Sequence, residues 1–136
     1  MTTVLLATDA DWIRDEVDAA LADDDTTVSR VRQGVDVLPA TSALHPDLVV
    51  LDLQIGAMGG IAACFDLRLE EGAQRIDPVK VLLLLDRADD RFLAEHAGAD
   101  GWMMKPLDGF RLRRAARAVL DGAEWREHAS GVTTPA

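Results

Sequence analysis

Two carboxylates and a lysine stand close behind separate apolar runs of the sequence. Asp9 follows the run at residues 4–7, and Asp52 directly follows the run at 48–51. Lys105 comes after a shorter run. A carboxylate can attack a phosphoryl group, a divalent cation can bridge carboxylates and phosphoryl oxygens, and a lysine can neutralise the developing charge. The three side chains are therefore suited to forming an acyl phosphate, provided that the fold brings them together.

The same residues could bind a hard metal ion. Mg²⁺ prefers oxygen ligands and usually takes one or two carboxylates together with phosphate and water. Asp9 and Asp52 could supply two carboxylates, and the backbone carbonyl of Gln54 could supply a third protein ligand. The three histidines do not have the spacing typical of metal ligands, so we expect no zinc site. The expected metal is therefore Mg²⁺.

Apolar runs predict the strands that must position these groups. Those at residues 4–7, 48–51 and 79–85 are almost continuous rather than alternating, as in parallel strands buried on both faces. Weaker patterns predict two further strands, at residues 27–31 and 101–104. Helical patterns lie between and after the strands, at residues 12–22, 35–44, 61–71, 90–97 and 110–120.

The alternation of strands and helices predicts the fold. Right-handed crossovers between successive strands give a parallel sheet with helices on both faces. We expect a doubly wound α/β domain with five parallel strands in the flavodoxin-like order 2-1-3-4-5. In such sheets ligands bind at the carboxyl ends of strands one and three, where Asp9 and Asp52 stand. Asp11 and Asp108 occupy positions where helix N-caps are expected.

Composition narrows the range of functions. The 136 residues are enough for one domain, which we place at residues 1–122, followed by a partly disordered tail at 123–136. The formal net charge of −10 disfavours contact with nucleic acid or an anionic membrane. The single cysteine, Cys64, and the lack of a signal peptide or a long apolar segment predict a cytoplasmic protein. The tail is too short for a DNA-binding domain, so we expect output through protein contacts.

Three segments of the chain resemble a known family. They are PDLVVLDLQIGAMGG at residues 46–60, AGADGWMMKPL at residues 97–107, and the opening VLLATDADWIRDEV. Together they resemble the receiver domain of bacterial two-component response regulators, over about residues 4–120. The chain is also similar to a group of atypical stand-alone receivers from actinobacteria. The resemblance implies a (βα)5 fold and a role in phosphorelay signal transduction as a phosphoprotein.

The resemblance also implies roles for particular residues. Asp52 resembles the phosphoacceptor, and Lys105 resembles the lysine that stabilises its charge. Asp9 resembles one member of an acidic pair that binds Mg²⁺. A cis peptide would join Lys105 to Pro106, and Trp102 resembles an aromatic residue that rotates when the switch operates.

Two departures from the family pattern concern this switch. Receivers carry two adjacent acidic residues after the first strand, and Thr8 replaces the first of them, so we expect weaker affinity for Mg²⁺. Receivers also end the fourth strand with Ser or Thr, and counting back from Lys105 places Leu83 there. A change of register would not restore a hydroxyl, because residues 82–85 are all leucine. We therefore expect phosphate to be weakly coupled to the rest of the domain.

These observations predict a single-domain signalling protein that accepts phosphate at Asp52 from a histidine kinase or phosphotransfer protein. It would act on a downstream protein partner, and a homodimer could form through the fourth helix, fifth strand and fifth helix, with Arg113 and Arg117 at the rim. We expect no enzyme activity beyond Mg²⁺-dependent self-phosphorylation and dephosphorylation at Asp52. The alternative is a receiver-like scaffold that binds its partner whatever its phosphorylation state, which Thr8 and Leu83 favour.

Overall fold

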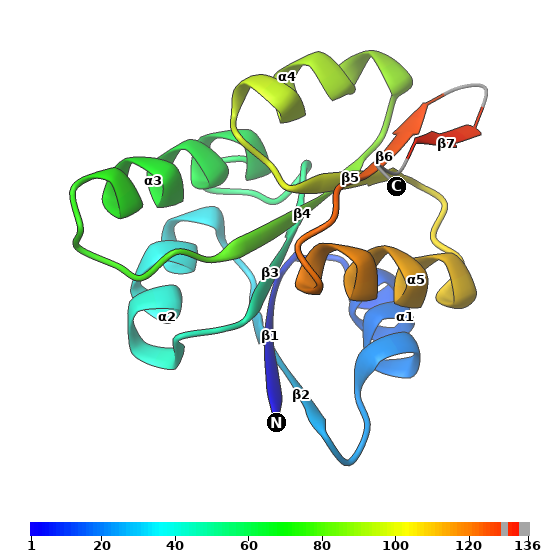
Figure 1. Ribbon diagram of the computed structural model, residues 1–136, viewed down its shortest axis with the longest axis horizontal. Coiled ribbons are helices and arrows are strands. Elements are labelled where there is room, and N and C mark those ends of the chain that lie inside the picture. The colour runs from blue at the N-terminus through cyan, green and yellow to red at the C-terminus, as the bar shows by residue number, and fades with distance from the viewer. Residues whose placement is uncertain (129–130, 134–136) are drawn as a thin grey trace.

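Seven strands form one sheet through the middle of the molecule. In the computed structural model, which describes residues 1–128 and 131–133, their order is β2-β1-β3-β4-β5-β6-β7 (Figure 1). The first six strands in this order are parallel, and β7 is antiparallel to β6. The strands span Thr2–Ala7 (β1), Thr26–Val31 (β2), Leu48–Asp52 (β3), Lys80–Leu85 (β4), Gly101–Met104 (β5), Trp125–His128 (β6) and Gly131–Thr133 (β7).

Five α-helices cover the two faces of the sheet in the described residues. One face carries α1 and α5, and the other carries α2, α3 and α4 (Figure 1). None of the helices in residues 1–128 is long and apolar enough to span a membrane. The helices span Asp11–Leu21 (α1), Val37–Leu44 (α2), Gly60–Gly72 (α3), Arg91–His96 (α4) and Gly109–Leu120 (α5), and 3₁₀ turns at Gly34–Asp36 (η1) and Ala88–Asp90 (η2) precede α2 and α4.

Each face of the sheet has its own buried core. Successive side chains of β3 point to opposite faces, so that Leu48 and Val50 pack on the side of α1 and α5. Val49 and Leu51 pack on the side of α2, α3 and α4. All four are fully buried. Continuous apolar runs mark the central strands because both of their faces are covered, and the prediction of a doubly wound α/β fold is confirmed.

The predicted number of five strands is wrong. The chain continues after α5 into β6, which pairs in parallel with β5, and then into β7. Residues 125–128 read WREH, so no apolar run indicates a strand there. Trp125 and Glu127 are nevertheless buried. The segment expected to be a partly disordered tail includes β6 and β7, and its residues 129–130 and 134–136 lie outside the described part of the chain.

The two aspartates expected at helix N-caps behave differently. Asp108 accepts hydrogen bonds from the backbone N–H groups of Phe110 and Arg111, so that prediction is confirmed. Asp11 is the first residue of α1 rather than its cap, and here the prediction is wrong. Its carboxylate accepts a hydrogen bond from Arg30 instead, and this bond lowers the pKa of Asp11.

Cys64 points from α3 into the core. It is fully buried, and its thiol donates to the backbone carbonyl of Ala97, with 3.4 Å between Sγ and the oxygen. Burial raises the pKa of the Cys64 thiol to about 11, from an ordinary value of 9.0. We therefore interpret Cys64 as a small apolar core residue, because the nucleophilic thiolate is disfavoured in this position.

Cys64 should make the fold less stable in alkaline solution. As the pH rises, the unfolded chain loses the thiol proton near pH 9.0, whereas the folded chain keeps it until about pH 11. Between these values the folded state binds more protons, so the free energy of unfolding falls as the pH rises through them. Urea unfolding over this range should show a steeper fall for the wild type than for Cys64→Ala. Equal slopes for the two proteins would contradict this interpretation.

Candidate functional site

Asp52 is the last residue of β3, and it is almost completely buried, with 2% of its surface exposed. One carboxylate oxygen, Oδ1, accepts hydrogen bonds from Lys105 Nζ at 2.5 Å and from the backbone N–H of Gln54 at 3.1 Å. The other oxygen, Oδ2, accepts a hydrogen bond from the hydroxyl of Thr8 at 2.7 Å. Burying a carboxylate is costly unless it is hydrogen-bonded, and here three donors from three segments satisfy it.

Lys105 joins two carboxylates. Its backbone N–H donates to the carbonyl of Leu85 at 2.9 Å, which holds the end of β5 beside the end of β4. Its Nζ lies 2.5 Å from Asp52 Oδ1 and 3.1 Å from Asp86 Oδ1. We did not predict Asp86. The sequence does indicate Asp86, because it directly follows a buried strand. The same pattern identifies Asp52.

Thr8 lies at the centre of this site and is fully buried. Its Oγ1 donates to Asp52 and accepts a hydrogen bond from the backbone N–H of Ala10 at 3.1 Å. An acidic residue in its place would put a second carboxylate beside Asp52, and the two would repel each other without a cation between them. Thr8 therefore satisfies Asp52 without adding negative charge.

Asp9 and Gln54 lie at the exposed rim of the site. Asp9 Oδ2 is 3.6 Å from the position that a Cβ atom on Gly56 would occupy, so the carboxylate faces the loop after β3. No group of three His, Cys, Asp or Glu side chains within the described residues is arranged to hold a metal ion. Asp9 and Asp52 nonetheless carry carboxylate oxygens, the hard kind of ligand that Mg²⁺ prefers alongside phosphate and water, so the chemistry of these two residues fits this ion.

An acid at position 8 should strengthen the metal site. In Thr8→Asp two carboxylates would face each other, so without Mg²⁺ the free energy of unfolding should fall by about 1 kcal/mol. Saturating Mg²⁺ should reverse the loss and raise the melting temperature of the variant more than that of the wild type. Thr8→Val, which removes the hydroxyl without adding charge, is the control. A Mg²⁺ response of Thr8→Asp no larger than that of the wild type would show that position 8 does not limit metal binding.

Leu83, the predicted switch position, does not lie at the end of β4. β4 ends at Leu85, and Leu83 lies inside the strand, paired with Trp102 of β5. Leu85 is fully buried and has no hydroxyl. The end of β4 therefore offers no counterpart of the Ser or Thr found in receivers.

Trp102 is held in place by β6. It is 3% exposed, and its indole Nε1 donates to the backbone carbonyl of Glu127 at 3.1 Å. The Arg126 guanidinium lies over its ring, 5.2 Å from the ring centre. An outward rotation of Trp102 would break both contacts. The peptide between Lys105 and Pro106, which follows β5, is cis.

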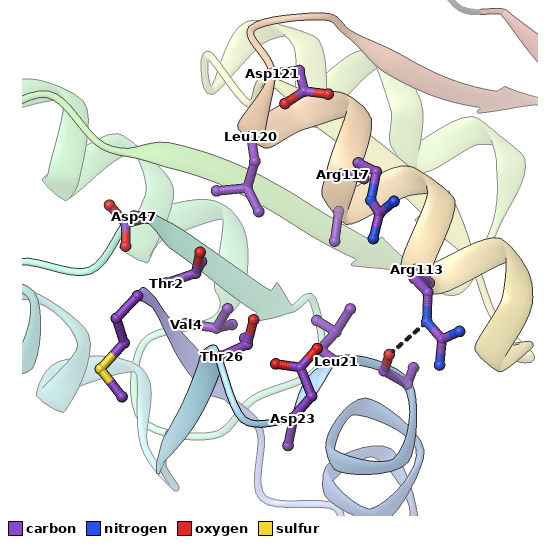
Figure 2. Close-up of a pocket in the computed structure, with 14 residues that line it drawn as sticks. Thr2, Val4, Leu21, Asp23, Thr26, Asp47, Arg113, Arg117, Leu120 and Asp121 are labelled. Atoms are coloured by element: carbon purple, nitrogen blue, oxygen red, sulfur yellow. Dashed lines mark hydrogen bonds between the residues drawn. The ribbon is translucent and has the colours of Figure 1, made fainter.

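A large pocket lies at the amino ends of the strands, on the opposite side of the sheet from Asp52 (Figure 2). It has a volume of about 720 Å³ and lies between the amino ends of β1 and β2 and the helices α1 and α5. Arg113 and Arg117, which we expect at the rim of the face formed by α4, β5 and α5, line this pocket on the side of α5 that faces α1. Arg113 Nε donates to the backbone carbonyl of Ala20 at 3.0 Å, near the end of α1. The groups suited to phosphoryl chemistry lie at the carboxyl ends of the strands, around Asp52.

Comparison with known proteins shows the family. A family model that describes the response regulator receiver domain matches residues 4–117. The transcriptional regulatory protein CseB of Streptomyces avermitilis is 36% identical over 121 residues, which cover 88% of this chain and 49% of CseB. The DNA-binding response regulator MtrA of Mycobacterium tuberculosis is 35% identical over 113 residues, which cover 76% of this chain and 47% of MtrA. This chain thus spans about half the length of the curated relatives it matches.

A solved structure shows the same fold. The receiver domain of the sensor histidine kinase PA1611 from Pseudomonas aeruginosa was crystallised with a magnesium ion in its active-site cleft. It aligns with a TM-score of 0.75 at 20% sequence identity, over 88% of this chain and 98% of that one. Because the family model covers most of its residues, the chain belongs to the family of response regulator receiver domains, which act in two-component systems.

Proposed function

We propose that this domain accepts a phosphoryl group on Asp52 from a histidine kinase or a phosphotransfer protein, and that it signals through contacts with a downstream protein. One observation carries the proposal: a buried carboxylate is held between the ammonium group of Lys105 and the hydroxyl of Thr8. It stands at the carboxyl end of β3 beside β1, where the strand order reverses. Doubly wound sheets bind their ligands at this point.

The chemistry follows from these contacts. An oxygen of Asp52 would attack the phosphorus atom, and the bond between phosphorus and the donor's nitrogen or oxygen would break, its electron pair leaving with the donor. Lys105 would neutralise the charge that develops on the phosphoryl oxygens. Mg²⁺, held by the carboxylates of Asp9 and Asp52 and the backbone carbonyl of Gln54, would supply further charge neutralisation.

We further propose that the phosphate switch is degenerate. Leu85 ends β4 without a hydroxyl that could follow the phosphoryl group. Trp102 is hydrogen-bonded to β6 rather than free to rotate. Thr8 removes one charge from the metal site, which lowers the expected affinity for Mg²⁺. Modification of Asp52 would then bias the two states of the domain only weakly.

The alternative function is a scaffold whose partner binding does not depend on phosphate. One observation favours it: both carboxylate oxygens of Asp52 already accept hydrogen bonds from the domain itself. Under either function the net charge of −10 supports output through proteins rather than through nucleic acid or a membrane. A homodimer through α4, β5 and α5 would have to accommodate β6, which pairs with the edge of β5.

The proposal is tested by measuring the intact mass after incubation with Mg²⁺ and acetyl phosphate. We expect a phosphoryl adduct in the wild type and none in Asp52→Asn. Asp86→Asn, which changes the other carboxylate that contacts Lys105, should keep the adduct and serves as the control. Tryptophan fluorescence recorded in parallel should change little on modification. The absence of an adduct, under conditions that modify an ordinary receiver, would favour the scaffold.

A further inference from the structure

Arg111 of α5 is hydrogen-bonded to the loop that carries Lys105. Arg111 Nη2 donates to the backbone carbonyl of Met104 at 2.7 Å and to that of Pro106 at 2.9 Å. These carbonyls flank Lys105 on both sides. Both bonds come from one nitrogen, whose two N–H directions are fixed by the planar guanidinium group, whereas a lysine ammonium group rotates freely. Arg111 therefore fixes the path of the backbone on which Lys105 stands.

Glu127 of β6 contacts both this loop and Arg111. It is 4% exposed, and its Oε1 accepts a hydrogen bond from the backbone N–H of Met104 at 2.7 Å. Its Oε2 accepts from the indole of Trp125 at 3.0 Å and lies 2.7 Å from Arg111 Nε. The Arg111 Nε–H is not aligned on an acceptor, so we treat this contact as an ion pair rather than a hydrogen bond. Burial of a carboxylate is costly unless its partners are placed well, as they are here.

The strand that supplies Glu127 is lightly attached to the sheet. β6 pairs with β5 through Gly101 with Trp125 and Trp102 with Arg126, whereas β1 pairs with β2 through six residue pairs. A short strand near the edge of a sheet, held to it by so few residue pairs, opens more easily than the central strands. Its buried carboxylate is therefore an important part of what holds it in place, and that carboxylate also holds the loop of Lys105.

We infer that Arg111 and Glu127 are positioning residues for phosphoryl transfer, which act by holding Lys105 over Asp52. The inference rests on the proposed function of Asp52. Arg111 and Glu127 together make three hydrogen bonds to the backbone at Met104 and Pro106, on either side of the lysine. Loss of either side chain would let the loop move, and displacements of about 1 Å reduce catalytic rates strongly. The strand β6, which contributes no group to the chemistry, thereby becomes part of the site.

The first test compares rates of adduct formation with acetyl phosphate and Mg²⁺ in the full chain. Glu127→Gln and Arg111→Gln should each slow the reaction about tenfold, and the double variant should be no slower than either single one. Arg114→Gln is the matched control, because Arg114 lies on the same helix and contacts the ring of Trp125 but not the loop. Arg111→Lys keeps the positive charge but lacks the planar guanidinium group, so it should react slowly as well. This variant still tests the inference if Glu127→Gln fails to fold.

The decisive readout is the dependence on Lys105. In a Lys105→Met background, Glu127→Gln and Arg111→Gln should cause no further slowing, because the group that they position is gone. Equal slowing with and without Lys105 would show a merely structural role and overturn the inference. Rates like that of the wild type in both single variants would overturn it too.

A second measurement separates this inference from the proposed function. Urea unfolding of the wild type, Lys105→Met, Glu127→Gln and the double variant forms a cycle that needs no phosphoryl donor. A coupling of about fivefold or more in the unfolding equilibrium constant supports the inference that Glu127 positions Lys105, and additive effects overturn it. A coupled cycle in a protein that forms no adduct would overturn the proposed function alone.

Discussion

Replacing Lys105 with methionine should lower the free energy of unfolding at pH 7 by about 3 kcal/mol, because it removes the cation from a nearly buried ion pair. Lys105 contacts both Asp52 and Asp86, and its side chain is 12% exposed. Methionine has a similar length and packs well, so the loss of charge dominates over the loss of volume. Without the ammonium group, Asp52 keeps the donors Thr8 and Gln54 but loses its positive partner.

Lys80 offers a control for this change. It is the other lysine of the chain and begins β4 at the opposite end of the strand from the site. Lys80→Met should leave the free energy of unfolding within about 0.5 kcal/mol of the wild type. The double variant Lys105→Met with Asp52→Asn should recover part of the loss, because the unpaired carboxylate is then gone. Urea unfolding measures all four proteins, and a Lys105→Met variant as stable as the wild type would show that the ion pair contributes nothing net.

Replacing Gly60 with alanine should lower the free energy of unfolding by about 2 kcal/mol, because the added methyl group would collide with backbone. A Cβ atom on Gly60 would lie 2.6 Å from the carbonyl oxygen of Asp52 and 3.0 Å from the Cα of Leu53. Backbone at the end of a buried strand cannot yield as a flexible side chain could. Relief of the collision would therefore displace Asp52 from its hydrogen-bond partners, and we expect slower formation of the phosphoryl adduct as well.

Gly72 supplies the matched control, because it lies at the other end of the same helix, α3. A Cβ atom there would meet no atom within 4 Å. Gly72→Ala should be neutral or should raise the free energy of unfolding by up to about 1 kcal/mol, since alanine favours the helix. Thermal unfolding and adduct formation measured on both variants check the pair. If Gly60→Ala matches Gly72→Ala in both measurements, the close approach of Gly60 to Asp52 does not constrain the site.

Much of the site could be predicted from the sequence because its groups follow strands that are apolar throughout. A strand buried on both faces is continuous in sequence, so its end is easy to find, and parallel strands bring their ends to one edge. This reasoning places Asp52 and Lys105 together, and they form an ion pair in the structure. The same reasoning applies to Asp86, which follows the apolar run at residues 79–85 but is not part of the family pattern.

The C-terminal strands could not be predicted in this way. β6 presents the polar sequence WREH, and its burial depends on particular partners rather than on an apolar pattern. Glu127 is buried only because Arg111, Trp125 and the backbone of Met104 surround its carboxylate. These partners are distant in the sequence or lack a regular spacing. Leu83 lies inside β4 and not at its end, which counting residues back from Lys105 does not locate.

The last two strands also change what the sheet offers to other molecules. Without them its edge would be β5, whose sequence GWMM presents apolar side chains along a row of unpaired backbone groups. Such an edge can template pairing with another chain and lead to aggregation, whereas very short edge strands suppress it. Here β7, three residues long and antiparallel to β6, ends the sheet instead. The segment that contributes Glu127 to the loop of Lys105 should therefore also keep the domain from aggregating edge to edge.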